Sequence, residues 1–275
     1  MPHLDSSTTT TTSSTMTTTF TSLETATTTV LDEKAAVTLS TTIADPPPST
    51  DTPANPDPQP LPYWLVNVPK AQWPTECPPF LQNLPPKSIQ CLSTPDALHP
   101  RQDWALVKEL VASNQIYLLQ RMPSDLRNYL EYISKIKAVY GSVLDFVVRK
   151  RLGWVGQLEA RGKRPFECLD DIKILYNDWP YGVEKDIVHL VVWTKFELDE
   201  EPGTDDLTPE IFRAVDGFVE RTFRSRMPGE NVIWFKNWKS LKSVHAIEHF
   251  HVMLYKASPE FLHEVTNGDA PVQQI

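Results

Sequence analysis

Three of the seven histidines in the chain fall within the seven residues from His245 to His251. Polar and apolar residues alternate from His249 onward, which predicts a strand over residues 249–255 with His249 and His251 on one face. Neighbouring imidazoles can share a reaction, because one attacks phosphorus while the other orients it or donates a proton. We therefore take His249 and His251 as candidate catalytic residues. Since the other face is apolar, we expect both to face solvent or a cleft; the alternative is two half-exposed polar residues on an edge strand.

The same segment suggests a metal site as a further alternative. His245-Ala246-Ile247-Glu248-His249 matches the H-x-x-E-H signature of a class of zinc peptidases. That signature needs a helix, which places its two histidines on one face, whereas the alternation predicts a strand. A looser metal site could be built from His189, His245, His249 and His251. We assign no metal ligand and expect no cofactor.

Four segments with strand patterns have to position these histidines: Lys173–Tyr176, Ile187–Thr194, Asn231–Phe235 and His249–Tyr255. The second is a mostly apolar run, which is typical of a central strand. Helical spacing of apolar residues predicts helices over Asp103–Ala112, from an N-cap at Ser124 to Arg151 with Gly141 as a break, over Asp205–Arg224 with Thr208 as cap, and a short one after Ser258. The predicted class is α+β, with a mainly antiparallel sheet and helices on one side of it.

The first sixty residues have a different composition. Ser and Thr make up 19 of the 24 residues from Ser6 to Thr29, and Pro makes up 8 of the 17 from Pro46 to Pro62. Such a stretch has too little apolar surface to offset the entropy of ordering it. We predict a disordered tail over residues 1–60 and one α+β domain over residues 61–275. The domain would begin with a Pro-rich arm whose aromatic side chains, such as Trp64, dock on it.

Charge and cysteine content narrow the class of protein. The formal net charge is -9, and the first sixty residues carry two thirds of it. The remainder lacks the excess of Lys and Arg that a general nucleic-acid binder needs. Three cysteines without paired spacing fit a reducing compartment, and no run is long and apolar enough to span a membrane. We expect no membrane association and a cytoplasmic location, with the nucleus left open.

The order of these elements resembles that of the histidine-triad superfamily of nucleotide hydrolases and transferases. The resemblance rests on Asn177-Asp178-Trp179-Pro180-Tyr181, the strand from His189 to Lys195, the helix start Asp206–Glu210, Asn237 with Ser243-Val244, and His249-Phe250-His251-Val252. It implies a histidine-triad-like fold in which His249 attacks an α-phosphorus and His251 holds it in place. Asn237 and Ser243 would bind phosphate oxygens, with Asn177 and His189 as further ligand-binding residues.

The sequence departs from that superfamily at two places. Ile247 stands where the first histidine of the triad is expected, and Trp238, Ser240 and Leu241 stand where the phosphate loop has glycines. Bulkier side chains there would close the pocket or leave it to a different ligand. Lys236, Lys239 and Lys242 lie along this loop, and such cations would favour an anionic ligand.

A second resemblance spans more of the chain. It rests on the runs Pro62–Pro69, Asn177–Gly182, His189–Trp193 and Glu248–Val252. These are similar to a fungal family named N-acetylglucosamine-induced protein. The family name implies a fungal source and a link to amino sugars, and it implies no reaction.

Two functions follow as hypotheses. The first is a protein that binds a nucleotide, sugar phosphate or nucleotide sugar, with phosphoryl or nucleotidyl transfer through His249. The second is a non-catalytic ligand-sensing or protein-interaction module induced by amino sugars. The paired histidines favour the first, and the missing glycines and missing triad histidine favour the second. The expected partner is a small anionic ligand; the sequence identifies no protein partner.

Overall fold

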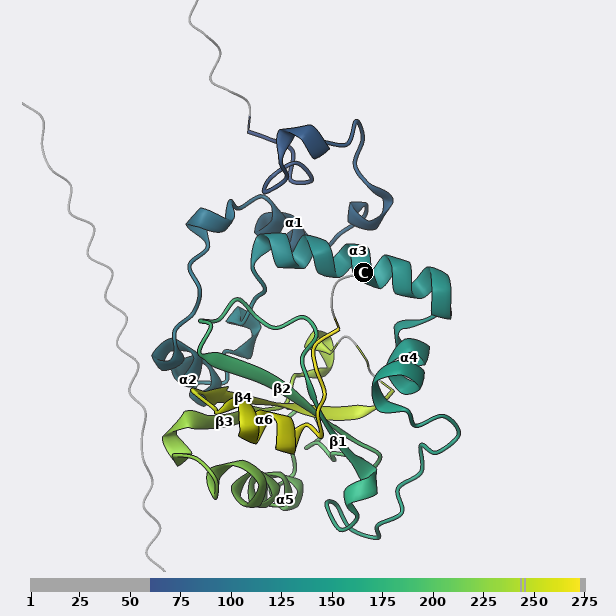
Figure 1. Cartoon of the computed structure of the whole chain (residues 1–275), viewed down its shortest axis with the longest axis vertical. Coiled ribbons are helices and arrows are strands. Elements are labelled where there is room, and N and C mark those ends of the chain that lie inside the picture. Colours follow the sequence, from purple (N-terminus) through teal and green to yellow (C-terminus); the bar gives the residue numbers. More distant parts are fainter. Residues whose placement is uncertain (1–59, 243, 245, 273–275) are drawn as a thin grey trace, which may run out of the picture. The chain divides into compact units, whose positions relative to one another are not determined.

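The computed structural model describes residues 60–242, 244 and 246–272, all of which belong to one compact unit, Pro56–Ile275 (Figure 1). The predicted disordered tail therefore lies outside the described residues except for Pro60. Ser243 and His245 also lie outside them.

The core of the fold is a four-stranded antiparallel sheet. Its strands are β1 (Ile172–Tyr176), β2 (Ile187–Thr194), β3 (Val232–Phe235) and β4 (Glu248–Tyr255), in the order β1-β2-β4-β3. All neighbouring pairs are antiparallel, so the predicted α+β class with an antiparallel sheet is confirmed. β2 and β4 lie in the centre, and their register pairs His189 with Met253, Val191 with His251 and Trp193 with His249.

One face of the sheet packs against α5 (Pro209–Val219) and α6 (Pro259–Val265). The Thr208 hydroxyl caps α5 by accepting from the amide of Ile211, and Ser258 caps α6 in the same way. The apolar stripe of α5 meets Phe250, Val252 and Leu254 of β4. Phe212, also on α5, lies outside this stripe and is 51% exposed.

The opposite face is covered as well, which corrects the expectation of helices on one side only. α2 (Trp104–Ala112) packs beside β3, and the central part of α3 (Pro123–Tyr140) packs over the β1 end together with α4 (Val143–Phe146). Figure 1 shows α3 and α5 on opposite sides of the strands. The face that carries the histidines is therefore buried.

The boundaries of the long helix differ slightly from the predicted ones. Pro123 is the first residue of α3, so Ser124 lies inside the helix rather than at its N-cap. A proline suits this position because its missing N–H would have no helical partner there. The helix ends at Gly141, as predicted, with a φ of 80°. A wider helical turn, Val147–Leu152, follows α4.

The segment before α2 is part of the fold. α1 (Pro86–Leu92) and the short turn Pro79–Leu81 both pack on α3. The Tyr63 hydroxyl donates to the carbonyl of Leu81, and Arg127 of α3 donates to the carbonyl of Trp64. The aromatic arm therefore contacts the rest of the unit, although the Trp64 side chain is only half-buried.

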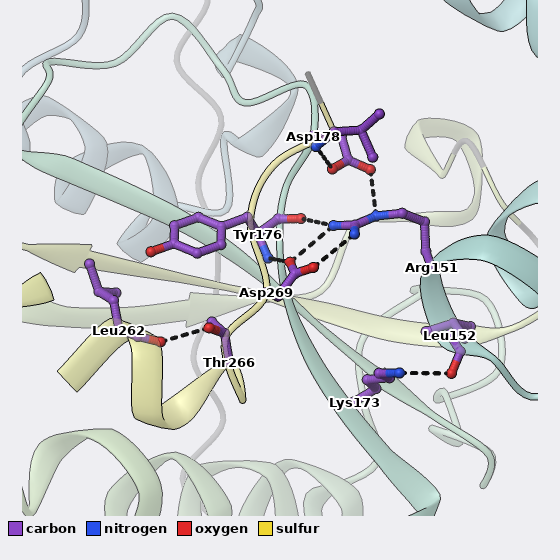
Figure 2. Close-up of polar contacts among 9 residues, drawn as sticks. Arg151, Leu152, Lys173, Tyr176, Asp178, Leu262, Thr266 and Asp269 are labelled. Atoms are coloured by element: carbon purple, nitrogen blue, oxygen red, sulfur yellow. Dashed lines mark hydrogen bonds and ion pairs between the residues drawn. The ribbon is translucent and has the colours of Figure 1, made fainter. Parts of the chain in front are cut away.

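The chain after α6 is held by Arg151 (Figure 2). Its guanidinium donates two hydrogen bonds to the carboxylate of Asp269, at 2.8 and 3.0 Å, and one to Asp178, at 2.9 Å. Asp269 also accepts from the amide of Tyr176, and Asp178 accepts from the amide of Val272. This group of contacts, which we call the Arg151 clamp, fastens residues 269–272 to the end of β1.

Candidate functional site

Four of the predicted site residues form one chain of polar contacts across the sheet. Asn177 follows β1, His189 lies on β2, His251 lies on β4 and Asn237 follows β3. The His189 Nε2 and His251 Nδ1 atoms are 2.9 Å apart, the His251 Nε2 atom is 3.0 Å from the Asn237 amide nitrogen, and the Asn177 amide nitrogen is 3.3 Å from His189 Nε2. The chain continues to Tyr181, whose hydroxyl accepts from the Asn237 amide at 3.2 Å.

The amides fix the direction of these hydrogen bonds. The Asn177 side-chain oxygen accepts from the amide of Trp179, so its nitrogen faces the His189 ring, 3.4 Å from Nδ1 and 3.3 Å from Nε2. Asn237 directs its nitrogen at His251 Nε2, which must therefore accept. The proton of His251 is then on Nδ1 and is donated to His189 Nε2.

Both imidazoles are neutral in this environment. Burial, together with the nearby Arg121 guanidinium, lowers the pKa of His189 to about 3. Burial, the neighbouring imidazoles of His189 and His249, and the cations Arg121 and Lys242 lower the pKa of His251 well below its usual range. A buried imidazolium would be destabilising unless an anion compensated its charge. The chain of polar contacts supplies only neutral partners, so neither ring is protonated twice.

His249 lies beside this chain and is not a link in it. Its Nδ1 atom donates to the carbonyl of Ile247 at 2.9 Å. Its ring lies against Trp193, with ring centroids 4.5 Å apart, and 5.7 Å from the ring of His251. With the proton on Nδ1, the lone pair of a neutral imidazole is on Nε2.

The predicted exposure of the histidines is wrong. His189, His249 and His251 are 3%, 4% and 5% exposed. The alternation of residues in β4 placed them correctly on one face, but that face is covered by α2, α3 and the segments joined to them. Hydrogen bonds to neighbouring side chains offset the desolvation cost of burying His189 and His251. Ser243, the remaining predicted ligand-binding residue, lies outside the described residues.

The structure also bears on the metal alternative. His249 lies in strand β4, so the H-x-x-E-H match is not helical. Both ring nitrogens of His251 are engaged by Asn237 and His189. In the part of the chain that the structure describes, no group of three or more His, Cys, Asp or Glu side chains could hold a metal ion.

Two of the three lysines expected to favour an anion beside this loop are already paired, and the side chain of the third, Lys239, lies outside the described part of the structure. Lys242 donates to both carboxylate oxygens of Glu248, at 3.1 Å, and Lys236 pairs with Glu200. Lys236 also lies 3.8 Å from Glu248. These two lysines therefore pair with partly buried carboxylates instead of facing a ligand.

A cavity of about 170 Å³ adjoins the Tyr181 end of the polar chain. We call it the Arg121 cavity. Its lining includes Tyr181, Leu241 of the predicted phosphate loop, and two cations, Arg121 and Lys87. Arg121 donates to the carbonyl of Trp179 and lies 4.1 Å from the ring centre of Tyr129. Among the described residues no Asp or Glu lines this cavity, and neither cation has a carboxylate within 4.0 Å.

Sequence reasoning missed Arg121, Lys87 and Tyr181 as site residues. Tyr181 ends the Asn-Asp-Trp-Pro-Tyr run on which the histidine-triad resemblance rests, so its position in that turn could have identified it as a site residue. Arg121 and Lys87 stand in segments without a motif, and only the packing of α1 on α3 brings them together.

Comparison with known proteins places this fold in a family. The family model described as "Protein of unknown function (DUF3605)" matches residues 103–255. The chain belongs to this family. The matched region includes all four strands, the whole polar chain and Arg121. Lys87 and α6 lie outside it.

Two curated relatives are fungal. N-acetylglucosamine-induced protein 1 of Candida albicans is 26% identical over 184 residues, covering 60% of this chain and 72% of that protein. An uncharacterised protein of Saccharomyces cerevisiae is 30% identical over 158 residues, covering 55% of this chain and 78% of that protein. The resemblance to the fungal N-acetylglucosamine-induced family is thus confirmed.

The structure of this chain is also similar to a crystal structure of a protein called HTC1. It has a TM-score of 0.48 and 25% sequence identity, and the match covers 60% of this chain and 94% of that one. Within residues 60–242, 244 and 246–272, no helix has both the length and the apolar character needed to cross a membrane.

Proposed function

We propose that this DUF3605 family member binds a small phosphorylated ligand in the Arg121 cavity. The observation that carries the proposal is a cavity with two cations, Arg121 and Lys87, and no lining carboxylate among the described residues. Arginine suits a phosphate because its planar group can donate two parallel hydrogen bonds to it. The volume of about 170 Å³ favours a sugar phosphate over the larger nucleotides and nucleotide sugars.

The rest of the lining fits the sugar part of such a ligand. Ser88 and Gln120 line the cavity and supply a hydroxyl and an amide, and Tyr181 adds a second hydroxyl. Tyr181 is in turn bound to Asn237, so its orientation depends on the polar chain. The neutral histidines of that chain leave the positive charge of the cavity to Arg121 and Lys87. In this role the polar chain positions a ligand-contacting residue and performs no chemistry.

The Candida albicans relative is named for induction by N-acetylglucosamine. This supports a phosphorylated amino sugar as the first ligand to test. Under this proposal the protein is a ligand-sensing module that binds the sugar phosphate without converting it.

A second candidate function is phosphoryl or nucleotidyl transfer through His249, in a histidine-triad-like fold. One contact favours it: the Ile247 carbonyl holds the Nδ1 proton of His249, which leaves the lone pair on Nε2 as a nucleophile requires. The central position of the His-x-His strand in an antiparallel sheet supports the same reading.

Thermal shift and calorimetry with one ligand panel test both functions. The panel contains N-acetylglucosamine 6-phosphate, N-acetylglucosamine, inorganic phosphate, AMP and UDP-N-acetylglucosamine. We expect the phosphorylated sugar to raise the melting temperature, since binding stabilises the folded state by RT ln(1 + [L]/Kd). Arg121→Met and Lys87→Met should each weaken this binding about tenfold or more, as loss of a charge-assisted hydrogen bond would. Arg149→Met is the matched control, because Arg149 is exposed and outside the cavity.

The outcomes separate the two candidates. Unchanged affinity in both Arg121→Met and Lys87→Met would exclude the Arg121 cavity as the site. Turnover of nucleoside phosphoramidates by the wild type, lost in His249→Asn, would establish the second function. Absence of both binding and turnover at millimolar ligand would remove both proposals.

A further inference from the structure

A second cavity lies between α3, α4 and the sheet. We call it the Tyr132 cavity. Its volume is about 100 Å³, and its walls include Tyr132, Ile136, Phe146, Trp179 and Trp193. None of its lining residues lines the Arg121 cavity, so an inference about it does not depend on the proposed function.

The hydroxyl of Tyr132 has no partner among the described residues. The side chain lines the cavity and is 7% exposed, and its oxygen is buried without a hydrogen bond. Burial, with Asp178 nearby, raises the pKa of Tyr132 to about 12, so the phenol keeps its proton and can donate it. Buried polar atoms are nearly always hydrogen-bonded, so an exception in a cavity wall indicates a missing partner.

We propose that the Tyr132 cavity binds a small uncharged aromatic molecule, one ring in size, that carries one oxygen able to pair with the Tyr132 hydroxyl. Two observations carry the proposal together: the aromatic walls and the single unpartnered hydroxyl between them.

The size and the walls define the ligand. Cavities of about 150 Å³ lined by apolar side chains accept benzene, and this one is somewhat smaller. The rings of Tyr129 and Tyr132 lie near Trp179, at centroid distances of 5.9 and 5.3 Å, within the range in which aromatic rings attract one another. A further ring between these walls would make similar contacts.

The charged groups in the lining do not select an ion. Arg151 and Asp178 line the cavity, but they belong to the Arg151 clamp, in which one guanidinium is shared by the carboxylates of Asp178 and Asp269 (Figure 2). Val272, at the end of the clamped segment, packs against the same cluster of side chains as Tyr132. The charged groups of the clamp therefore have their hydrogen bonds made within it, which leaves the interior of the cavity to an uncharged ligand.

Binding of phenol and toluene to the full chain tests the inference. The two probes have the same number of heavy atoms and differ in the oxygen. We expect the wild type to bind phenol about five- to tenfold more tightly than toluene, which is the worth of one neutral hydrogen bond. Tyr132→Phe should lose the preference for phenol, because it keeps the ring and leaves the hydroxyl of the probe without a partner. Tyr140→Phe is the matched control, since Tyr140 lies outside the cavity lining, and it should keep the preference.

A cavity-filling variant provides a second measurement. Ile136→Phe should remove the binding of both probes; if it does not fold, the comparison of Tyr132→Phe with Tyr140→Phe still decides. The inference is overturned if neither probe binds the wild type at millimolar concentration, or if Tyr132→Phe keeps the preference for phenol. The first result would indicate a cavity that holds water, and the second a site elsewhere.

Discussion

His189 and His251 are buried as neutral groups that satisfy each other. Each ring accepts or donates through neighbours that hold fixed positions on four different segments of the chain. Such a pair is tolerated in a core because no charge has to be removed from water. Because the two rings are neutral only in the folded state at acidic pH, the stability of the folded protein depends on pH.

The free energy of unfolding should fall as the pH drops below about 6.5. An unfolded histidine takes up a proton near 6.5, whereas the folded pKa of His189 is about 3 and that of His251 is also lowered. Between these values the unfolded state binds more protons, so acid favours it. The contribution is fully present above pH 6.5, and each imidazole removes about 1.4 kcal/mol per pH unit below it.

Urea unfolding of the wild type between pH 7 and pH 5 measures this slope. His251→Gln, although less stable at every pH, should show a slope smaller by about half. His263→Gln is the control, because His263 is exposed, and it should leave the slope unchanged. A flat wild-type profile between pH 6 and pH 5 would contradict neutral burial of the pair.

The sequence predicted which face of β4 carries its histidines, but it did not predict what surrounds that face. Alternation in β4 indicated that His249 and His251 share a face, and that is the case. It did not show that the face is covered, because the covering side chains come from α2 and α3, far away along the chain. The alternating pattern is the same for a histidine that is exposed and hydrogen-bonded to water and for one that is buried and hydrogen-bonded to an asparagine.

At the scale of elements, each strand was predicted to within one residue. β2 matches its predicted range, because an apolar run of that length fits a strand covered on both faces. α5 was predicted through its cap at Thr208 and begins at Pro209. The Arg151 clamp was not predicted. Asp269 is 118 residues from Arg151, and a basic triplet two residues before Gly153 has the sequence pattern of a solvated helix end.

Arg151→Met should destabilise the fold by about 3–5 kcal/mol, because it leaves two carboxylates without their counter-charge in a largely buried site. The side chains of Arg151, Asp178 and Asp269 are 11%, 17% and 12% exposed. Hydrogen exchange at the Val272 amide, which now donates to Asp178, should accelerate with it. Chemical denaturation and exchange measure the two effects.

Arg149→Met is the control for this prediction. Arg149 is 63% exposed and pairs with Asp145 at 3.7 Å on the same helix. Such surface pairs contribute about 0–1 kcal/mol. Equal losses in the two variants would show that the Arg151 clamp is no stronger than a surface ion pair.

At the scale of the whole molecule, the segments before the first strand complete the fold. α2 and α3 supply the second cover of the sheet, and α1 with residues 116–121 supplies most of the Arg121 cavity. The composition of residues 1–59 predicts no such role. We expect a chain that starts at Pro60 to melt within about 5 °C of the full chain, since a larger fall would correspond to about 1 kcal/mol or more of lost contacts.

A chain that starts at Pro74 provides the contrast. It loses the carbonyl of Trp64, which accepts from Arg127, and the hydroxyl of Tyr63, which donates to Leu81. Its melting temperature should fall well below that of the chain that starts at Pro60. If the two truncated chains melt together, the arm contributes nothing to the fold.

The chain of contacts from Asn177 to Tyr181 also constrains how this protein can evolve. Each member leaves a donor or acceptor unmatched in the sheet if it alone is replaced. Selection therefore acts on the set, and its members should be inherited or exchanged together among family members. A descendant that lost Asn237 while keeping His251 would carry an imidazole nitrogen without this donor in the centre of its sheet, and a second substitution would have to follow.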